Sequence, residues 1–120
     1  MEYIYALQKR LSFGKIRNQA GEFVAASLET IAVAVDRAAP IHDDFKVSLV
    51  NAPGTGAYPI ASFTWLVVPV HIADERNRDT IVNLLKWMLG PGQRQAAALG
   101  YLALPKDLAA REAAAVATLH

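Results

Sequence analysis

The sequence contains no cysteine, which excludes disulfide bonds and thiolate metal sites. Cysteine gives no information about the compartment here, because many exported bacterial proteins also lack it. Long hydrophobic runs are missing too, and no stretch approaches the roughly 20 apolar residues of a membrane helix. The first ten residues, MEYIYALQKR, have an acid at position 2 and only a short apolar run, so no signal peptide is predicted.

An excess of one charge is absent as well. Twelve Lys and Arg face eleven Asp and Glu, and the longest basic cluster lies within residues 8–10. Nucleic-acid binding needs a basic face, so a nucleic-acid partner is not expected. The 120 residues are 53% apolar, many of them alanine, which is the composition and length of one globular domain.

The first half of the chain carries the β-prone segments. Tyr3–Ala6 suits a strand, and Leu11–Glu22 contains turn signals typical of an irregular excursion or a small hairpin. Ser27 is a good helix cap, and the apolar spacing after it predicts a helix over about 27–38 that Pro40 stops.

Two further strands are predicted before residue 71. Lys46–Val50 alternates polar and apolar residues, and Asn51–Gly56 has turn chemistry. Tyr58–Val70 is the longest β-like run, and we expect a strand that is buried for most of its length.

Helices dominate the carboxyl half. A strong amphipathic pattern follows Asp74 and ends at Gly90-Pro91, Gln93–Leu99 predicts a second short helix, and Pro105 suits the first turn of a third one that reaches about Leu119. The fold class is therefore α/β, with a few strands and about four helices.

The segment Gly54-Thr55-Gly56 raises the possibility of a phosphate-cradling loop. A Walker loop needs Lys and Ser or Thr after its last glycine, but here Ala57 and Tyr58 follow. A dinucleotide loop follows a strand and opens a helix, whereas this one precedes a β-prone run. A flexible turn is the better interpretation.

No enzyme or metal site is indicated. The histidines His42, His71 and His120 lie far apart without metal-ligand spacing, and His42-Asp43-Asp44 is better read as solvated surface than as a weak cation site. The hydroxyls of Ser48, Ser62 and Thr64 lack a nucleophile-elbow sequence. Trp87 and Tyr101 could stack on a ligand, yet a core position is favoured for Trp87 because it lies among apolar helical positions.

Three segments together are more specific than any single motif. They are EYIYALQKRLSFGKIRNQAGEFVAASLET, NAPGTGAYPIASFTWLVVP and LLKWMLGPGQRQAAALGYLALP. In their order and spacing the sequence resembles the carboxyl-terminal portion of the phosphate-specific solute-binding protein of the bacterial phosphate ABC importer, from Glu2 to about Ala117. The resemblance implies that residues 1–120 are a single carboxyl-terminal segment of a two-lobed, periplasmic-binding-protein-like fold.

The resemblance also implies a function and a location. Members of the family are periplasmic or lipid-anchored, and they deliver inorganic phosphate to inner-membrane ABC transporter components. Their phosphate ligands lie upstream of this region, so no ligand-binding residue maps onto this chain, and no cofactor or catalytic residue is implied. Tyr58, Pro59, Ser62 and Thr64 are then expected to be scaffold residues near the hinge or cleft.

Alternative functions stay open at this point. A segment without the rest of its lobe exposes apolar faces and strand edges, so a homodimer or a domain-swapped assembly is expected if it is stable alone. A standalone, self-associating scaffold module that lost phosphate binding is the main alternative. A binding protein for another oxyanion is a weaker variant, and an enzyme is more distant still.

Overall fold

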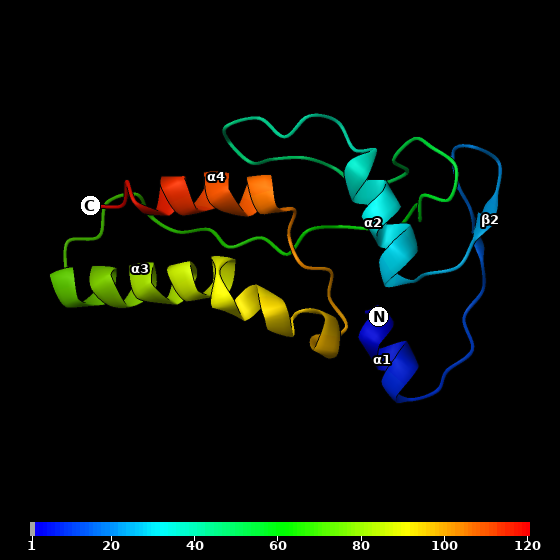
Figure 1. The fold of residues 1–120 in the computed structure, drawn as a ribbon, viewed down its shortest axis with the longest axis horizontal. Coiled ribbons are helices and arrows are strands. Elements are labelled where there is room, and N and C mark those ends of the chain that lie inside the picture. The colour runs from blue at the N-terminus through cyan, green and yellow to red at the C-terminus, as the bar shows by residue number, and fades with distance from the viewer. Residues whose placement is uncertain (1) are drawn as a thin grey trace. The chain divides into compact units, whose positions relative to one another are not determined.

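The computed structural model describes residues 2–120, shown as a ribbon in Figure 1. Within these residues the structure is mixed α/β with helices dominating, which agrees with the predicted fold class at that level. The elements, in chain order, are α1 (Tyr3–Gln8), β1 (Ile16–Arg17), β2 (Phe23–Val24), α2 (Leu28–Asp36), α3 (Glu75–Leu89), the 3-10 helices η1 (Pro91–Gln95) and η2 (Ala97–Leu99), and α4 (Lys106–Val116).

The chain divides into two compact units. The first runs to Thr64 and includes Gly100–Leu102, and the second contains Trp65–Leu99 and Ala103–His120. Each unit has its own buried residues. That residues 1–120 form one segment of a larger lobe stays a prediction.

The core of the first unit is built mainly from alanine. Its buried members are Ala34, Leu49, Ala52, Ala57 and Ala61. Larger apolar side chains from α2 and residue 63 pack around them and are only partly buried. Because alanine side chains remove little apolar surface from water, this core gives the unit modest hydrophobic stabilisation.

Helix α2 begins where the sequence predicts. The Ser27 hydroxyl accepts a hydrogen bond from the Thr30 amide at 3.2 Å, and the Thr30 hydroxyl accepts one from the Ser27 amide at 3.0 Å. This reciprocal pair satisfies two amides that the helix itself leaves unpaired. Glu29 lies in the first turn, and the hydrogen bond from the Ser27 side chain lowers the pKa of its carboxyl group.

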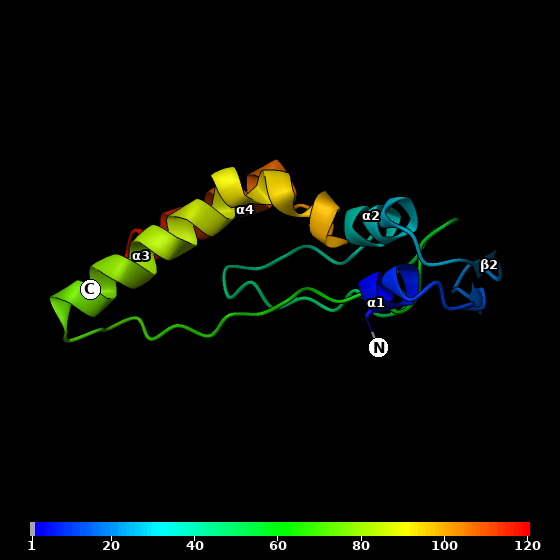
Figure 2. The same cartoon turned by 90° about the horizontal axis from the view of Figure 1, so that it is seen from below.

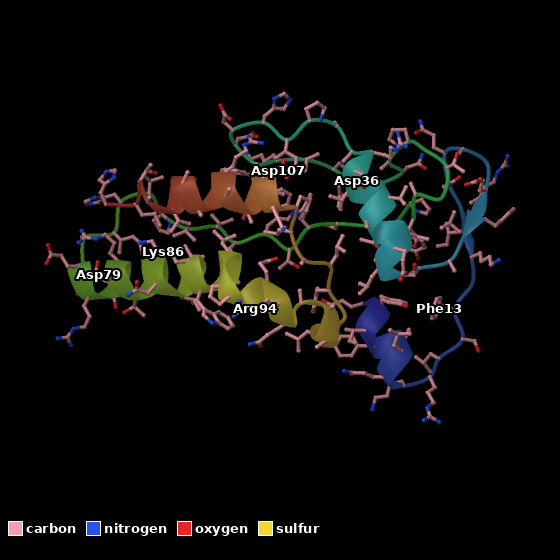
Figure 3. The ribbon with its side chains drawn as sticks, in the orientation of Figure 1. Phe13, Asp36, Asp79, Lys86, Arg94 and Asp107 are labelled. Atoms are coloured by element: carbon pink, nitrogen blue, oxygen red, sulfur yellow. The ribbon has the colours of Figure 1, made fainter. Side chains whose placement is uncertain are left out.

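The second unit is a pair of helices. Helices α3 and α4 run antiparallel and lie side by side in Figures 1 and 2. Asp74 caps α3 through a 2.7 Å hydrogen bond from the Asn77 amide, and Gly90 ends it. Leu85, Leu108 and Val116 are buried. The polar side chains of α3, such as Asp79 and Lys86, project from the helix in Figure 3.

The carboxyl-half predictions are therefore confirmed for α3 and α4. Helix α4 occupies Lys106–Val116, with Pro105 at its N-cap, and is shorter than predicted. The predicted short helix at Gln93–Leu99 exists as two 3-10 pieces, and Gly100 follows with a φ of 79°.

The strand predicted at Tyr3–Ala6 is wrong, because these residues belong to α1. The Ile4 side chain lies directly against Gly100, where an added Cβ would be 2.5 Å from Ile4 Cδ1. Tyr3 makes an edge-to-face contact with Phe13, labelled in Figure 3, at 5.7 Å between ring centres. Such tertiary contacts override a local preference for strand.

The strands predicted at Lys46–Val50 and Tyr58–Val70 are wrong as well. Both segments are irregular, and the only strands in the described residues are β1 and β2, which form the small antiparallel hairpin expected near Leu11–Glu22. A strand requires a neighbour for its backbone groups. Leu66, Val67 and Val68 make no backbone–backbone hydrogen bond within residues 2–120.

The long segment is also not buried. Exposed fractions reach 59% at Leu66, 98% at Val67 and 60% at Val70. The composition of this run predicts a buried strand, because Leu, Val and Ile side chains are usually buried. The observed exposure contradicts that prediction.

Two carboxyl groups give opposite pH dependences that can be tested. Partial burial raises the pKa of Glu112, so this residue favours the folded state at low pH and loses that contribution as pH rises through its folded pKa. Glu29, with its lowered pKa, contributes stability above the ordinary pKa of a glutamate side chain and loses it as the pH falls through the folded pKa. At pH 7 we expect Glu112→Gln to raise the melting temperature and Glu29→Gln to lower it.

Thermal unfolding between pH 3 and pH 7 checks both changes. The two variants should approach the unsubstituted protein as the pH falls, because both carboxylates are then protonated in the folded and unfolded states. The same sign for both substitutions at pH 7 would contradict the assignment.

Candidate functional site

The loop at Asn51–Pro59 is held by the hairpin that precedes α2. Asn18, whose side chain is buried, donates from Nδ2 to the Ala57 carbonyl at 3.2 Å and to the Gly54 carbonyl at 3.4 Å. Its Oδ1 accepts a hydrogen bond from the Glu22 amide at 2.9 Å. One amide side chain thus joins the hairpin turn to the loop.

Glu22 makes a second connection to the same loop. Its Oε2 accepts a 2.7 Å hydrogen bond from the Gly56 amide. A carboxylate on a backbone N–H takes the position that an anion would need in a phosphate-cradling loop. This contact supports the interpretation of Gly54-Thr55-Gly56 as a turn.

The base of the loop is closed by two backbone hydrogen bonds. The Asn51 amide donates to the Pro59 carbonyl at 2.8 Å, and the Tyr58 amide donates to the Thr30 carbonyl of α2 at 3.0 Å. The two bonds fix the loop against the helix whose cap was described above.

Glycine is required at two positions of the loop. Gly54 has a φ of 114° and Gly56 a φ of 76°, a region that side chains disfavour. At Gly54 an added Cβ would also lie 3.1 Å from Cγ of Arg37. The two glycines of the Pro-Gly-Thr-Gly sequence are therefore explained by backbone geometry.

The predicted scaffold residues divide between two environments. Pro59 is buried and Tyr58 is partly buried, and both belong to the closed base of the loop. Ser62 and Thr64 are exposed, and the Ser62 hydroxyl donates to the Phe63 carbonyl at 2.9 Å. Their role beside a hinge or cleft stays a prediction.

Trp87 was expected in the core, and that prediction is wrong, since 47% of the residue is exposed. Its ring lies over Gly92, where an added Cβ would be 3.1 Å from a ring carbon.

Tyr101 is bound through its hydroxyl, which donates to the Glu2 carboxylate at 2.8 Å. That hydrogen bond and the nearby negative charge raise the pKa of Tyr101.

An open, mainly apolar groove lies between the end of α3 and the start of α4. Gln93 spans one end of it, with Nε2 donating to the Met88 carbonyl at 2.7 Å and Oε1 accepting from the Leu104 amide at 2.8 Å. Its remaining lining is Leu89, Gly90, Lys106 and three alanines of α4. Lys106 is the charged residue of this lining.

In the segment His42-Asp43-Asp44, the Asp44 carboxylate is bound by the nearby residue Lys46. Asp44 Oδ1 accepts from the Lys46 amide at 3.1 Å, and the Lys46 ammonium lies 3.9 Å from Asp44 Oδ2. No group of three or more His, Cys, Asp or Glu side chains suited to a metal ion occurs in residues 2–120. The structure does bring His71 and His120 together, a proximity that no sequence spacing indicates.

Comparison with known proteins gives a consistent result, although no family model matches the sequence. A relative from Xylella fastidiosa (strain Temecula1), named phosphate-binding protein PstS, is 35% identical over 109 residues. Proteins of the same name from Methanocaldococcus jannaschii and Haemophilus influenzae are 34% and 28% identical. Each alignment covers 90% of this chain.

The resemblance to phosphate-binding proteins is confirmed. The matches fit a carboxyl-terminal portion of PstS, as the three sequence segments indicate. The chain spans only 30–33% of the length of these relatives. The similarity therefore relates this chain to one part of a longer protein.

The contacts of Asn18 predict a large effect of one substitution. In Asn18→Ala the Gly54 and Ala57 carbonyls lose a buried donor, and the Glu22 amide loses its side-chain acceptor. We expect a loss of about 1–3 kcal/mol in the free energy of unfolding. Chemical denaturation measures it.

Gln19→Ala is the matched control, because Gln19 is the exposed neighbour in the same turn. Its effect should stay below about 0.5 kcal/mol. Equal effects of the two substitutions would show that the Asn18 side chain does not hold the loop.

Proposed function

We propose that this chain is the carboxyl-terminal part of a phosphate-binding protein for ABC-type phosphate import, and that it supplies scaffold and not ligand contacts. The observation that carries the proposal is the similarity to PstS proteins, which extends over 90% of the chain but only about 30% of the relatives. Inorganic phosphate is the ligand that the relatives' name specifies, and here it would be bound by the longer protein.

The exposed segment before α3 supports a role as part of a larger sheet. Trp65, Leu66, Val67 and Val68 are four consecutive apolar residues, so both faces of an extended strand would be apolar. Such runs are typical of strands that are covered on both faces. With Leu66–Val68 unpaired in residues 2–120, we infer that strands from the rest of the longer protein pair with this segment.

The loop chemistry supports the absence of a phosphate site from this part. The Gly56 amide is directed to the Glu22 carboxylate, and a negative charge at that position repels an anion. The ligand-contacting residues would then lie upstream, and Tyr58, Pro59, Ser62 and Thr64 would act as scaffold beside the hinge or cleft.

The proposal also specifies the class of the protein, its cellular location and its partners. The relatives are named as binding proteins, which supports a non-catalytic role without a cofactor. A periplasmic or surface-anchored location and contact with inner-membrane transporter components would follow from that role. None of the helices in residues 2–120 has the length and apolar character needed to cross a bilayer.

A second function is favoured by the exposed apolar residues. A standalone module could cover Leu66, Val67 and Val70 by pairing with a second copy, as a homodimer or a domain-swapped assembly. Selectivity for an oxyanion other than phosphate would be decided by residues outside this chain.

Equilibrium dialysis against labelled phosphate separates the two functions. We expect no uptake by the 120-residue chain at millimolar phosphate. Fusion of the chain to the upstream two-thirds of the Xylella fastidiosa relative should produce saturable binding. In that fusion Val67→Asp should abolish binding, because a charge inside a paired, covered strand is strongly disfavoured.

Asn83→Asp in the same fusion is the control for added charge, since Asn83 is an exposed residue of α3 outside the proposed scaffold residues. Saturable micromolar binding by the 120-residue chain alone would contradict the scaffold assignment. A stable dimer in sedimentation equilibrium, with a fusion that stays inactive, would favour the self-associating module.

A further inference from the structure

Residue 120 is joined to the segment before α3 by two backbone hydrogen bonds. The His120 amide donates to the Val70 carbonyl at 3.0 Å, and the Ile72 amide donates to the His120 carbonyl at 2.7 Å. Bonds from one residue to the two neighbours of another are the pattern of parallel strand pairing. His71 and His120 are therefore directly opposite one another, both within the second unit.

The two imidazole rings are adjacent in consequence. Their centres are 5.7 Å apart and their planes are tilted by 55°. A zinc ion bound to two imidazole nitrogens at about 2.0–2.1 Å each, at a near-tetrahedral angle, holds the ring centres roughly 5–6 Å apart. The spacing therefore suits a shared ion.

One of the two rings has a backbone carbonyl as a hydrogen-bond partner. Nδ1 of His120 lies 3.1 Å from the Thr118 carbonyl, and when Nδ1–H donates to that carbonyl the lone pair is on Nε2. Metal-binding histidines commonly use the other ring nitrogen in this way, which fixes the tautomer and the ring orientation.

The Thr118 carbonyl is itself held in place. The Thr118 amide donates to the Ala115 carbonyl at 3.0 Å, and the Thr118 hydroxyl donates to the same carbonyl at 2.7 Å. Both histidines are exposed, so an ion can reach the rings and water can complete its coordination.

We propose that His71 and His120 form a binding site for a borderline transition-metal ion, with water as the remaining ligands. Neutral imidazole nitrogen suits Zn²⁺, Ni²⁺ and Cu²⁺ and is a poor ligand for Mg²⁺. The bound ion would join the end of α4 to residues 70–72. Spacing in the sequence missed this pair because the fold, and not a local motif, brings the two residues together.

Isothermal titration of the untagged 120-residue chain at pH 7.5 with Zn²⁺, Ni²⁺, Cu²⁺ and Mg²⁺ tests the proposal. We expect one site per chain, tightest for Cu²⁺ as the general order of divalent-metal affinity requires, and no binding of Mg²⁺. His71→Ala and His120→Ala should each weaken Zn²⁺ binding at least tenfold. His42→Ala, which removes a histidine outside the pair, should leave it unchanged.

Two further readouts separate the pair from general surface binding. Zn²⁺ affinity should fall as the pH is lowered, because a protonated imidazole nitrogen has no lone pair for the ion. Substoichiometric Ni²⁺ should broaden the ring-proton resonances of His71 and His120 together, before those of His42. Zn²⁺ binding that survives both alanine substitutions in folded protein, or no binding at millimolar Zn²⁺, would overturn the proposal.

Discussion

Extended backbone needs a partner for its N–H and C=O groups, and this requirement governs the segment between the Asn51–Pro59 loop and α3. Leu66, Val67 and Val68 find no such backbone partner within residues 2–120, and Val67 is almost fully exposed. An exposed apolar segment whose backbone groups are unpaired is a template for strand pairing. We propose that a sheet built from the rest of a longer phosphate-binding protein supplies this partner.

Polar side-chain hydrogen bonds hold the Asn51–Pro59 loop and the start of α2. Asn18 and Glu22 hold the loop through three hydrogen bonds, and Ser27 and Thr30 hold the start of α2. The core of the first unit is mainly alanine, so polar contacts carry much of its specificity. A small alanine core beside exposed larger apolar side chains fits a segment that packs against other parts of a longer chain.

Sequence reasoning succeeded where structure is local. The Ser27 cap marks the start of α2, and the amphipathic pattern between Asp74 and Gly90 marks α3, and each signal acts within a few residues. It failed at Tyr58–Val70, because a strand is decided by a neighbour that no local pattern can supply. Tyr3–Ala6 failed for a related reason, since its contact with Gly100 joins distant parts of the chain.

The candidate site was predictable only in part. The turn at Gly54-Thr55-Gly56 was predictable because the segment is rich in glycine and matches neither phosphate-binding motif. The hydrogen bond between Glu22 and Gly56 is visible only in the structure. The proximity of His71 and His120 depends on one bridge between the end of the chain and residues 70–72, so it also had no sequence signal. The resemblance to phosphate-binding proteins, in contrast, was accessible from three long segments without any structure.

Amide hydrogen exchange at Leu66, Val67 and Val68 tests the central claim most directly. The account predicts little protection of these amides in the 120-residue chain and strong protection once the chain is joined to the upstream two-thirds of a phosphate-binding relative, because pairing in a sheet slows exchange. Strong protection in a monomeric 120-residue chain, or none in the joined protein, would contradict it.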